Sequence, residues 1–243
     1  MIFRRTLLLA ISLALACWWW LWGKRPVEAE NAVDGGKVAV SGKFTPDAAA
    51  ATKGPASAEE LKSAARGYIR ELGPDELQIG SVRLNKRKRT ISFPAKVAEK
   101  ERALEYVIVH ETGKTHEALL STSAAIHDGH VAALLLDAGG LSPQIEVTWR
   151  KHGGDARVPL HAMIGMKGGS LDAVWHYNGS EFIHGGFAAS REGSVVALMN
   201  DPSALVNHPA AGALMKDDVF FAQRAQLPPE GVQVIVVMTF TNP

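Results

Sequence analysis

The densest apolar patterning outside the N-terminal segment lies in the middle of the chain, in residues 104–140. Residues 104–110 are rich in β-branched and aromatic side chains, which predicts a strand that is buried on both faces. Thr112-Gly113 fits a two-residue turn, although Thr disfavours the positive φ of such turns. We therefore expect the chain to return from Lys114 as the second strand of an antiparallel hairpin.

The apolar period changes from two to 3.6 after the run Ser121-Thr122-Ser123. This change predicts a helix from about Ile126 to Ala138, ended by Gly139-Gly140. His130 would lie on the flank of the helix. The apolar stripe itself would carry His127, Val131, Leu134 and Ala138. We expect the hairpin and the helix to bury their apolar sides against each other.

A leading helix is predicted at residues 57–73, because Ser57-x-x-Glu60 is a capping box and apolar residues then recur at helical spacing. Strands are predicted at 77–84 and 90–97. Further short strands are predicted at residues 144–151, 157–163, 171–177, 194–199 and 233–241. Asn178-Gly179 is the clearest hairpin signal in the chain.

These elements, about nine or ten strands and two helices, predict an α+β fold. It would be β-rich, with mainly antiparallel sheets, one central helix and one N-terminal docking helix. The globular domain would span residues 57–243. Residues 30–56 are rich in Ala, Gly and Lys without a sustained period, which predicts a flexible linker.

Residues 1–29 decide the predicted compartment. Arg4-Arg5 precede an apolar run that contains four tryptophans and ends at Lys24-Arg25. Three interpretations stay open: a cleaved signal peptide, an uncleaved transmembrane anchor, or a lipoprotein acylated at Cys17. Each places the domain outside the cytoplasm, either anchored to the membrane or free in the periplasm, so we expect a protein of the cell envelope.

The charge balance argues against a nucleic-acid partner. Without residues 1–29 the chain holds 22 basic and 24 acidic residues, a net charge of −2, whereas nucleic-acid-binding domains are basic. Four consecutive basic residues, 86–89, lie at a predicted hairpin tip. A solvated turn and a contact with anionic lipid headgroups are both open there.

The densest group of candidate metal ligands is His116-Glu117, followed by His127 and His130. Imidazole and carboxylate suit Zn²⁺ or a similar divalent ion, and His127 and His130 share one side of a helix turn. The spacing is not HExxH and matches no known ligand code. The alternative is that His127 is a core or cap histidine and that His116-Glu117 are ordinary strand positions.

A hydrolase site is the second candidate. A hydroxyl of residues 121–123 would be the nucleophile, with His127 as base and Glu117 to orient it. However, the chain has no Gly-x-Ser-x-Gly elbow there, and Ser or Thr before a helix is first of all an N-cap.

Several segments together resemble the YdjY-like domain of uncharacterised bacterial envelope proteins, especially forms from planctomycete-type bacteria. The segments are LEYVIVHETGKTHEALLSTSAA (104–125), WHYNGSEF (175–182), GSVVALMNDPSALVNHP (193–209) and VQVIVVM (232–238). The match covers about residue 77 to the C-terminus. The resemblance implies no established activity, and it gives no role to the motif residues Glu105, His116, Glu117 and Asn207-His208-Pro209.

Some members of that family are described as iron–sulfur proteins. The only cysteine of this chain is Cys17, so we expect no iron–sulfur cluster. The sequence thus predicts an envelope-exposed, non-enzymatic binding or accessory module, whose partner is another envelope protein, a metal ion or a small ligand. The alternative is a metal-dependent or Ser/His hydrolase with its site around His116, Glu117, His127 and His130.

Overall fold

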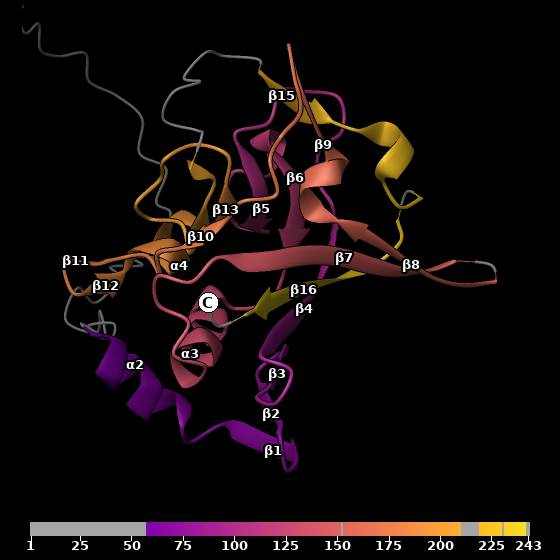
Figure 1. The fold of residues 1–243 in the computed structure, drawn as a ribbon. Helices are drawn as coiled ribbons and strands as arrows, with labels where there is room; N and C mark the ends of the chain where they lie inside the picture. The colour runs from indigo at the N-terminus through magenta and orange to yellow at the C-terminus, as the bar shows by residue number, and fades with distance from the viewer. Residues whose placement is uncertain (1–56, 152, 210–218, 230, 242–243) are drawn as a thin grey trace, which may run out of the picture. The chain divides into compact units, whose positions relative to one another are not determined.

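The computed structural model describes residues 57–151, 153–209, 219–229 and 231–241, all within a unit that spans residues 50–243. In these residues the fold is β-rich, with a mixed but mostly antiparallel sheet and few helices (Figure 1). The predicted α+β class is confirmed at this level. The predicted leader and linker lie outside the described residues, and no described helix is long and apolar enough to span a membrane.

The strands of the main sheet are β1 (Ile69–Gly73), β2 (Glu76–Ile79), β3 (Val82–Asn85), β4 (Thr90–Val97), β5 (Tyr106–His110), β6 (Ala118–Thr122), β7 (Pro143–Lys151), β8 (Gly154–Pro159), β10 (His176–Tyr177), β13 (Ser194–Ala197), β14 (Val206–Asn207) and β16 (Val234–Phe240). Two smaller pairs are β11 (Phe182–Ile183) with β12 (Gly186–Phe187), and β9 (Ile164–Met166) with β15 (Phe220–Ala222). The helices are α2 (Ala58–Ala65), α3 (Ile126–Leu135) and α4 (Ala188–Glu192), with 3-10 turns η1 (Thr115–Glu117), η2 (Leu160–Met163) and η4 (Arg224–Gln226).

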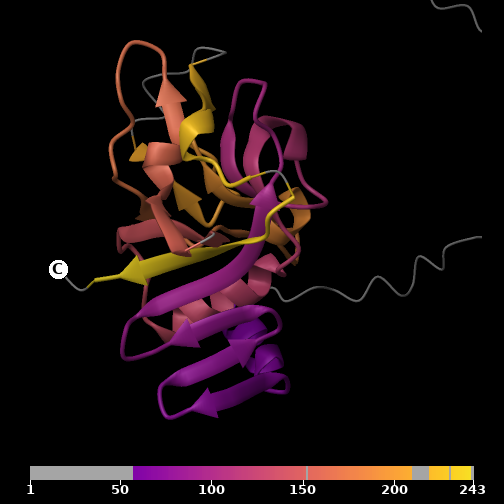
Figure 2. The same cartoon turned by 90° about the vertical axis from the view of Figure 1, so that its right-hand side faces the viewer.

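Strand β4 joins the parts of the main sheet. It pairs with β3 at residues 90–92, with β16 along residues 90–95, and with β6 at residues 96–97. From β3 the sheet continues through β2 to β1, from β16 through β7 to β8, and from β6 through β5, β13 and β14 to β10. Figure 2 shows β4, in magenta, running from the β1–β3 meander past the yellow β16.

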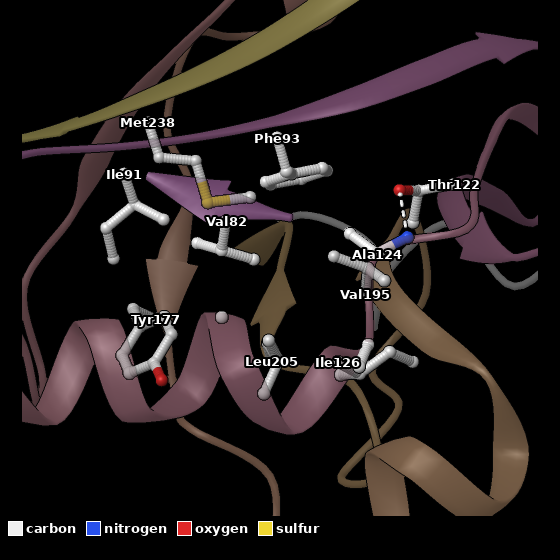
Figure 3. Close-up of a pocket in the computed structure, with 12 residues that line it drawn as sticks. Val82, Ile91, Phe93, Thr122, Ala124, Ile126, Tyr177, Val195, Leu205 and Met238 are labelled. Atoms are coloured by element: carbon white, nitrogen blue, oxygen red, sulfur yellow. Dashed lines mark hydrogen bonds between the residues drawn. The ribbon is translucent and has the colours of Figure 1, made fainter. Parts of the chain in front are cut away.

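Alternating burial in β4, β7 and β16 turns one side chain in two toward the core, as expected for strands covered on one face. Ile91 and Phe93 of β4 and Met238 of β16 point from this face toward α3 (Figure 3). Helix α3 therefore packs on the face of the sheet near β4, the strand that joins the parts of the main sheet.

The rotation of α3 differs from the prediction. The helix begins at Ile126 as predicted but ends at Leu135, three residues early. His130 is only 5% exposed, whereas the side chain of His127 is 41% exposed, so His130 and not His127 faces the core. Because the helix is apolar almost all round, the spacing of its apolar residues predicts that a helix forms but not which of its faces is buried.

The predicted mid-chain hairpin is wrong, because β5 and β6 are parallel. Tyr106 lies opposite Ala118, and His110 opposite Thr122. The chain turns back through residues 111–117, which include η1, before it enters β6. Both strands are buried on both faces, so their residue pattern says nothing about direction. Their antiparallel neighbours are β13 for β5 and β4 for β6.

The leading helix is shorter than predicted. Its N-cap is confirmed, since Ser57 Oγ accepts the backbone N–H of Glu60 at 3.2 Å. The helix ends at Ala65, and the residues that we expected in its last turns instead form β1, an antiparallel partner of β2. Tyr68 and Leu72 continue the helical spacing but are both exposed, so that spacing was not a sign of burial.

The Asn178-Gly179 hairpin is also wrong. Strand β10 pairs with β14, with His176 opposite Asn207. The tight turn comes one step later, between β11 and β12, where His184 and Gly185 have φ of 52° and 74°. Two consecutive residues of positive φ are typical of a type I′ turn. The β11–β12 pair forms a small sheet of its own.

The basic run 86–89 is a turn between β3 and β4 in which one residue differs from the others. Lys86, Arg87 and Lys88 are exposed. Arg89 Nε instead donates to the carbonyl of Phe240 at 2.9 Å, and its Nη2 donates to the carbonyl of Leu136, the C-cap of α3, at 2.9 Å. A cation at a helix C-terminus satisfies a free carbonyl and complements the helix dipole. The lipid contact stays a prediction.

We predict that Arg89→Ala lowers the free energy of unfolding by about 2 kcal/mol, because it removes two charge-assisted hydrogen bonds between three elements. Arg87→Ala is the matched control from the same turn. It removes only an exposed ion pair with Asp75 at 3.4 Å and should change stability by less than about 0.5 kcal/mol. Urea unfolding monitored by circular dichroism measures both. Equal effects of the two substitutions would contradict the capping role of Arg89.

Candidate functional site

Two hollows adjoin α3, and Tyr177 lines both of them. The first lies between α3 and the sheet, where mainly apolar side chains such as Ile91, Phe93 and Met238 surround it (Figure 3). Its volume is about 20 Å³, which is enough for about one water molecule. This hollow is therefore a packing defect rather than a ligand site.

The second hollow is larger and opens to solvent, and we call it the His130 cavity. Its volume is about 400 Å³, within the range of small-molecule sites. It is lined by His130, Ala133, Leu134, Asp137, Ala138, Gly139, Tyr177, Asn178 and Gly179. The second half of α3, the turn that follows it and the end of β10 thus form its walls.

His130 and Tyr177 form the buried polar pair of this cavity. Helix α3 positions the imidazole, and the short β10 positions Tyr177, whose backbone N–H donates to the carbonyl of Leu141 at 3.0 Å. His130 Nδ1 lies 2.7 Å from the Tyr177 hydroxyl oxygen. The Nε2 atom of His130 is buried and has no hydrogen-bond partner among the described residues.

Aromatic rings from the small β11–β12 sheet pack on the same imidazole. The ring centroids of His130 and Phe187 are 4.8 Å apart, and those of His130 and Phe182 are 6.2 Å apart. Burial among these rings lowers the pKa of His130 from 6.5 to about 4, because a charged imidazole is poorly solvated there. Burial likewise raises the pKa of the Tyr177 hydroxyl, so at neutral pH both side chains are uncharged.

His116 and Glu117, the first half of the predicted metal site, contact each other on η1. His116 Nε2 lies 2.8 Å from Glu117 Oε1; the side chain of His116 is exposed, and that of Glu117 is partly buried. A side-chain hydrogen bond shared with Glu105, followed by the charges of Lys114 and His116, holds the pKa of Glu117 below its usual value. The pair lies just before β6 in the chain, and α3 lies after it. Because the five residues of β6 span about 17 Å, the strand separates the pair from the α3 histidines.

His127 and His130, the second half, share α3 but have different partners. His127 Nε2 lies 3.3 Å from Asp128 Oδ1, while His130 contacts Tyr177. In the described part of the chain, no three His, Cys, Asp or Glu side chains gather in a way that could hold a metal ion. The structure thus brings His116 and Glu117 together, whereas His127 and His130 contact other residues, and a divalent metal stays a prediction.

The hydroxyl groups predicted as hydrolase nucleophiles, those of residues 121–123, lie where structural roles account for them. Thr122 Oγ1 donates to the carbonyl of Pro94 at 2.6 Å and accepts the N–H of Ala124 at 3.0 Å. Ser121 is buried in β6 and Ser123 is exposed. The N-cap of α3 is Ala125, without a side-chain bond, so the predicted Ser/Thr cap is wrong.

Asp128 is a second buried polar group on α3 that sequence reasoning missed. It is 4% exposed, and its Oδ1 accepts the hydroxyl hydrogen of Tyr68 at 2.9 Å. Partial burial of the hydroxyl, followed by the bond to Asp128, raises the pKa of Tyr68 to about 12, although 45% of the residue's surface is exposed. A side chain at Gly80 would clash, since its Cβ would lie 2.2 Å from Asp128 Oδ2. The hydrogen bond from Tyr68 joins α3 to the segment before β1, and the close approach of Gly80 joins α3 to the β2–β3 turn.

The Asn207-His208-Pro209 motif shapes a loop. The side chain of Asn207 accepts from the N–H of Asp201 and donates to its carbonyl, both at 2.9 Å. His208 is buried against Trp175, with ring centroids 5.2 Å apart, and its Nε2 lies 3.0 Å from the carbonyl of Asp172. These contacts support the backbone around β14 and leave no group of the motif in the His130 cavity.

Comparison of the chain with protein-family models, with curated proteins and with solved structures finds no significant match. The resemblance to YdjY-like domains therefore stays a prediction.

We predict that His130 makes folding stability depend on pH. Its pKa is about 4 when folded and near 6.5 when unfolded, so the unfolded chain binds more protons between these values. The free energy of unfolding should have its full value above pH 6.5 and should fall by up to about 3 kcal/mol as the pH drops toward 4. Urea unfolding at pH 7.5 and 4.5 measures the difference.

His130→Phe should lose this part of the pH dependence, whereas His116→Gln, a change at an exposed imidazole, should retain it. An unchanged pH dependence in His130→Phe would show that other groups cause it.

Proposed function

We propose that the domain of residues 57–243 is a non-enzymatic binding module that takes a small molecule into the His130 cavity. The observation that carries this proposal is the buried, uncharged His130: it lines an open cavity of about 400 Å³, and its Nε2 has no hydrogen-bond partner among the described residues. A buried polar atom without a partner costs free energy, and such costs are typical of sites that a ligand completes.

The chemistry of the cavity favours binding over catalysis. A general base is most effective when its pKa is close to the working pH, and the pKa of His130 is about 4. The described lining offers no Ser, Thr, Cys or Lys nucleophile. Ala133, Leu134 and Ala138 give the cavity an apolar side, which suits the body of an uncharged organic molecule.

We further propose that residues 1–29 direct the domain out of the cytoplasm, as a cleaved signal peptide, an uncleaved anchor or a segment acylated at Cys17. The basic start, the apolar run and the tryptophans support this location. The resemblance to YdjY-like envelope domains supports it as well. A domain in that position would present its ligand, or the change that the ligand causes, to another envelope protein.

The binding proposal is tested with a panel of small neutral aromatic ketones, amides and alcohols, acetophenone among them, added to the ¹⁵N-labelled full chain. We expect shifts of amide resonances around the cavity. Gly139→Phe should block them, because the Cβ position of Gly139 has no atom within 4 Å and the glycine lines the cavity.

Gly73→Phe is the matched control. Gly73 also has open space around its Cβ position, but it lies in β1 and not in the cavity lining. We expect this variant to bind as the wild type does. The proposal fails if no compound of the panel perturbs the cavity at millimolar concentration, or if Gly139→Phe binds as tightly as the wild type.

The location is tested by reporter fusions after Pro55. Alkaline phosphatase, which folds only outside the cytoplasm, should be active, and β-galactosidase should be inactive. The opposite pattern would place the domain in the cytoplasm and overturn this part of the proposal.

A further inference from the structure

The hydrogen on the His130 imidazole can be assigned from its surroundings. Tyr177 Oη is buried with His130, and His130 Nδ1 is its hydrogen-bond partner among the described residues. If Tyr177 donates its hydrogen to Nδ1, the imidazole carries its own hydrogen on Nε2, and one buried donor is left without an acceptor. The opposite tautomer would leave both the tyrosine hydrogen and the Nε2 lone pair without partners. The first tautomer therefore satisfies more buried polar groups.

Given the proposed binding function, on which this inference rests, we infer that the ligand presents a neutral hydrogen-bond acceptor, a carbonyl or ether oxygen, to the Nε2–H of His130. A donor group would meet another donor at that position. The same geometry makes Tyr177 a positioning residue, because its hydroxyl fixes the tautomer without having to contact the ligand.

The surroundings of the cavity favour an uncharged acceptor over a carboxylate or a phosphate. The imidazole offers one neutral donor rather than a positive charge. Asp137 is the charged residue of the described lining, and its carboxylate repels anions. The apolar side formed by Ala133, Leu134 and Ala138 then holds the hydrocarbon part of the ligand.

Access to Nε2 requires a small movement of the cavity wall, since this atom is buried. The neighbouring ring atom, Cε1, lies against Gly179: a Cβ at that glycine would be 3.2 Å from it. Gly179 and Ser180 both have positive φ, at 81° and 63°, so this part of the wall is an irregular turn. Phe187 packs on the imidazole as well. Binding of the acceptor should therefore shift the resonances of Gly179 and Phe187.

The test compares acetophenone with α-methylstyrene, which has nearly the same shape but carries a CH₂ group in place of the carbonyl oxygen. NMR titration of the full chain measures both dissociation constants. We expect acetophenone to bind roughly tenfold more tightly, the effect of one satisfied buried donor. His130→Phe keeps a ring but removes the donor, and should make the two compounds bind equally. His127→Phe, on the same helix, should preserve the preference.

Tyr177→Phe should reduce the preference for acetophenone, because it removes the hydrogen bond to Nδ1 that stabilises the Nε2–H tautomer. Selective ¹⁵N labelling of histidine reads the tautomer directly in the wild type and does not depend on whether the variants fold. A hydrogen on Nδ1 would overturn the inference. Equal binding of the two compounds to the wild type would also overturn it but leave the binding function intact. If neither compound nor any other of the neutral panel binds, the function and the inference both fail.

Discussion

The fold depends on how the buried polar groups of α3 find partners. This helix packs on the sheet through an almost wholly apolar surface, yet it buries Asp128, His130 and the C-terminal carbonyl of Leu136. Each of them has a hydrogen-bond partner in a different segment: Asp128 in Tyr68, His130 Nδ1 in Tyr177, and the Leu136 carbonyl in Arg89. Because a buried polar group without a partner costs free energy, these three bonds fix both the position and the rotation of the helix.

Of the side chains in these bonds, those of His130 and Tyr177 line the open cavity, and His130 keeps a buried nitrogen that has no partner among the described residues. Asp128 is enclosed by Tyr68, His127 and the Gly80 turn, and Arg89 binds two carbonyls. The packing that orients α3 thus leaves this nitrogen without a partner in the described part of the chain, and we propose that a ligand supplies one. The proposed binding function follows from this incomplete satisfaction rather than from any catalytic motif.

The sequence predicted correctly the bounds that a local signal marks, such as alternating apolar and polar residues or an N-cap. The alternation in 90–97 gave both ends of β4, and Ser57 gave the start of α2. It failed where a segment is apolar all round: β5 and β6 were assigned the wrong relative direction, and α3 the wrong buried histidine. It also failed for the end of the leading helix and for the Asn178-Gly179 hairpin, where a local pattern matched but the strands pair with other segments. Among the candidate ligands His130 was named, but Tyr177 and Tyr68 were not recognised as partners. They lie 47 and 60 residues from the groups they bind, and no local pattern encodes such contacts.

The most direct test of this account is a pH titration of the His130 side chain, followed by ¹⁵N and ¹H NMR of the folded wild-type chain. If burial against Tyr177 and Phe187 controls this group, its imidazole stays neutral from pH 8 down to about 5 and gains a proton only near pH 4. A His130 imidazole that titrates near its ordinary pKa of 6.5 would contradict the buried, neutral histidine on which the proposed binding site rests.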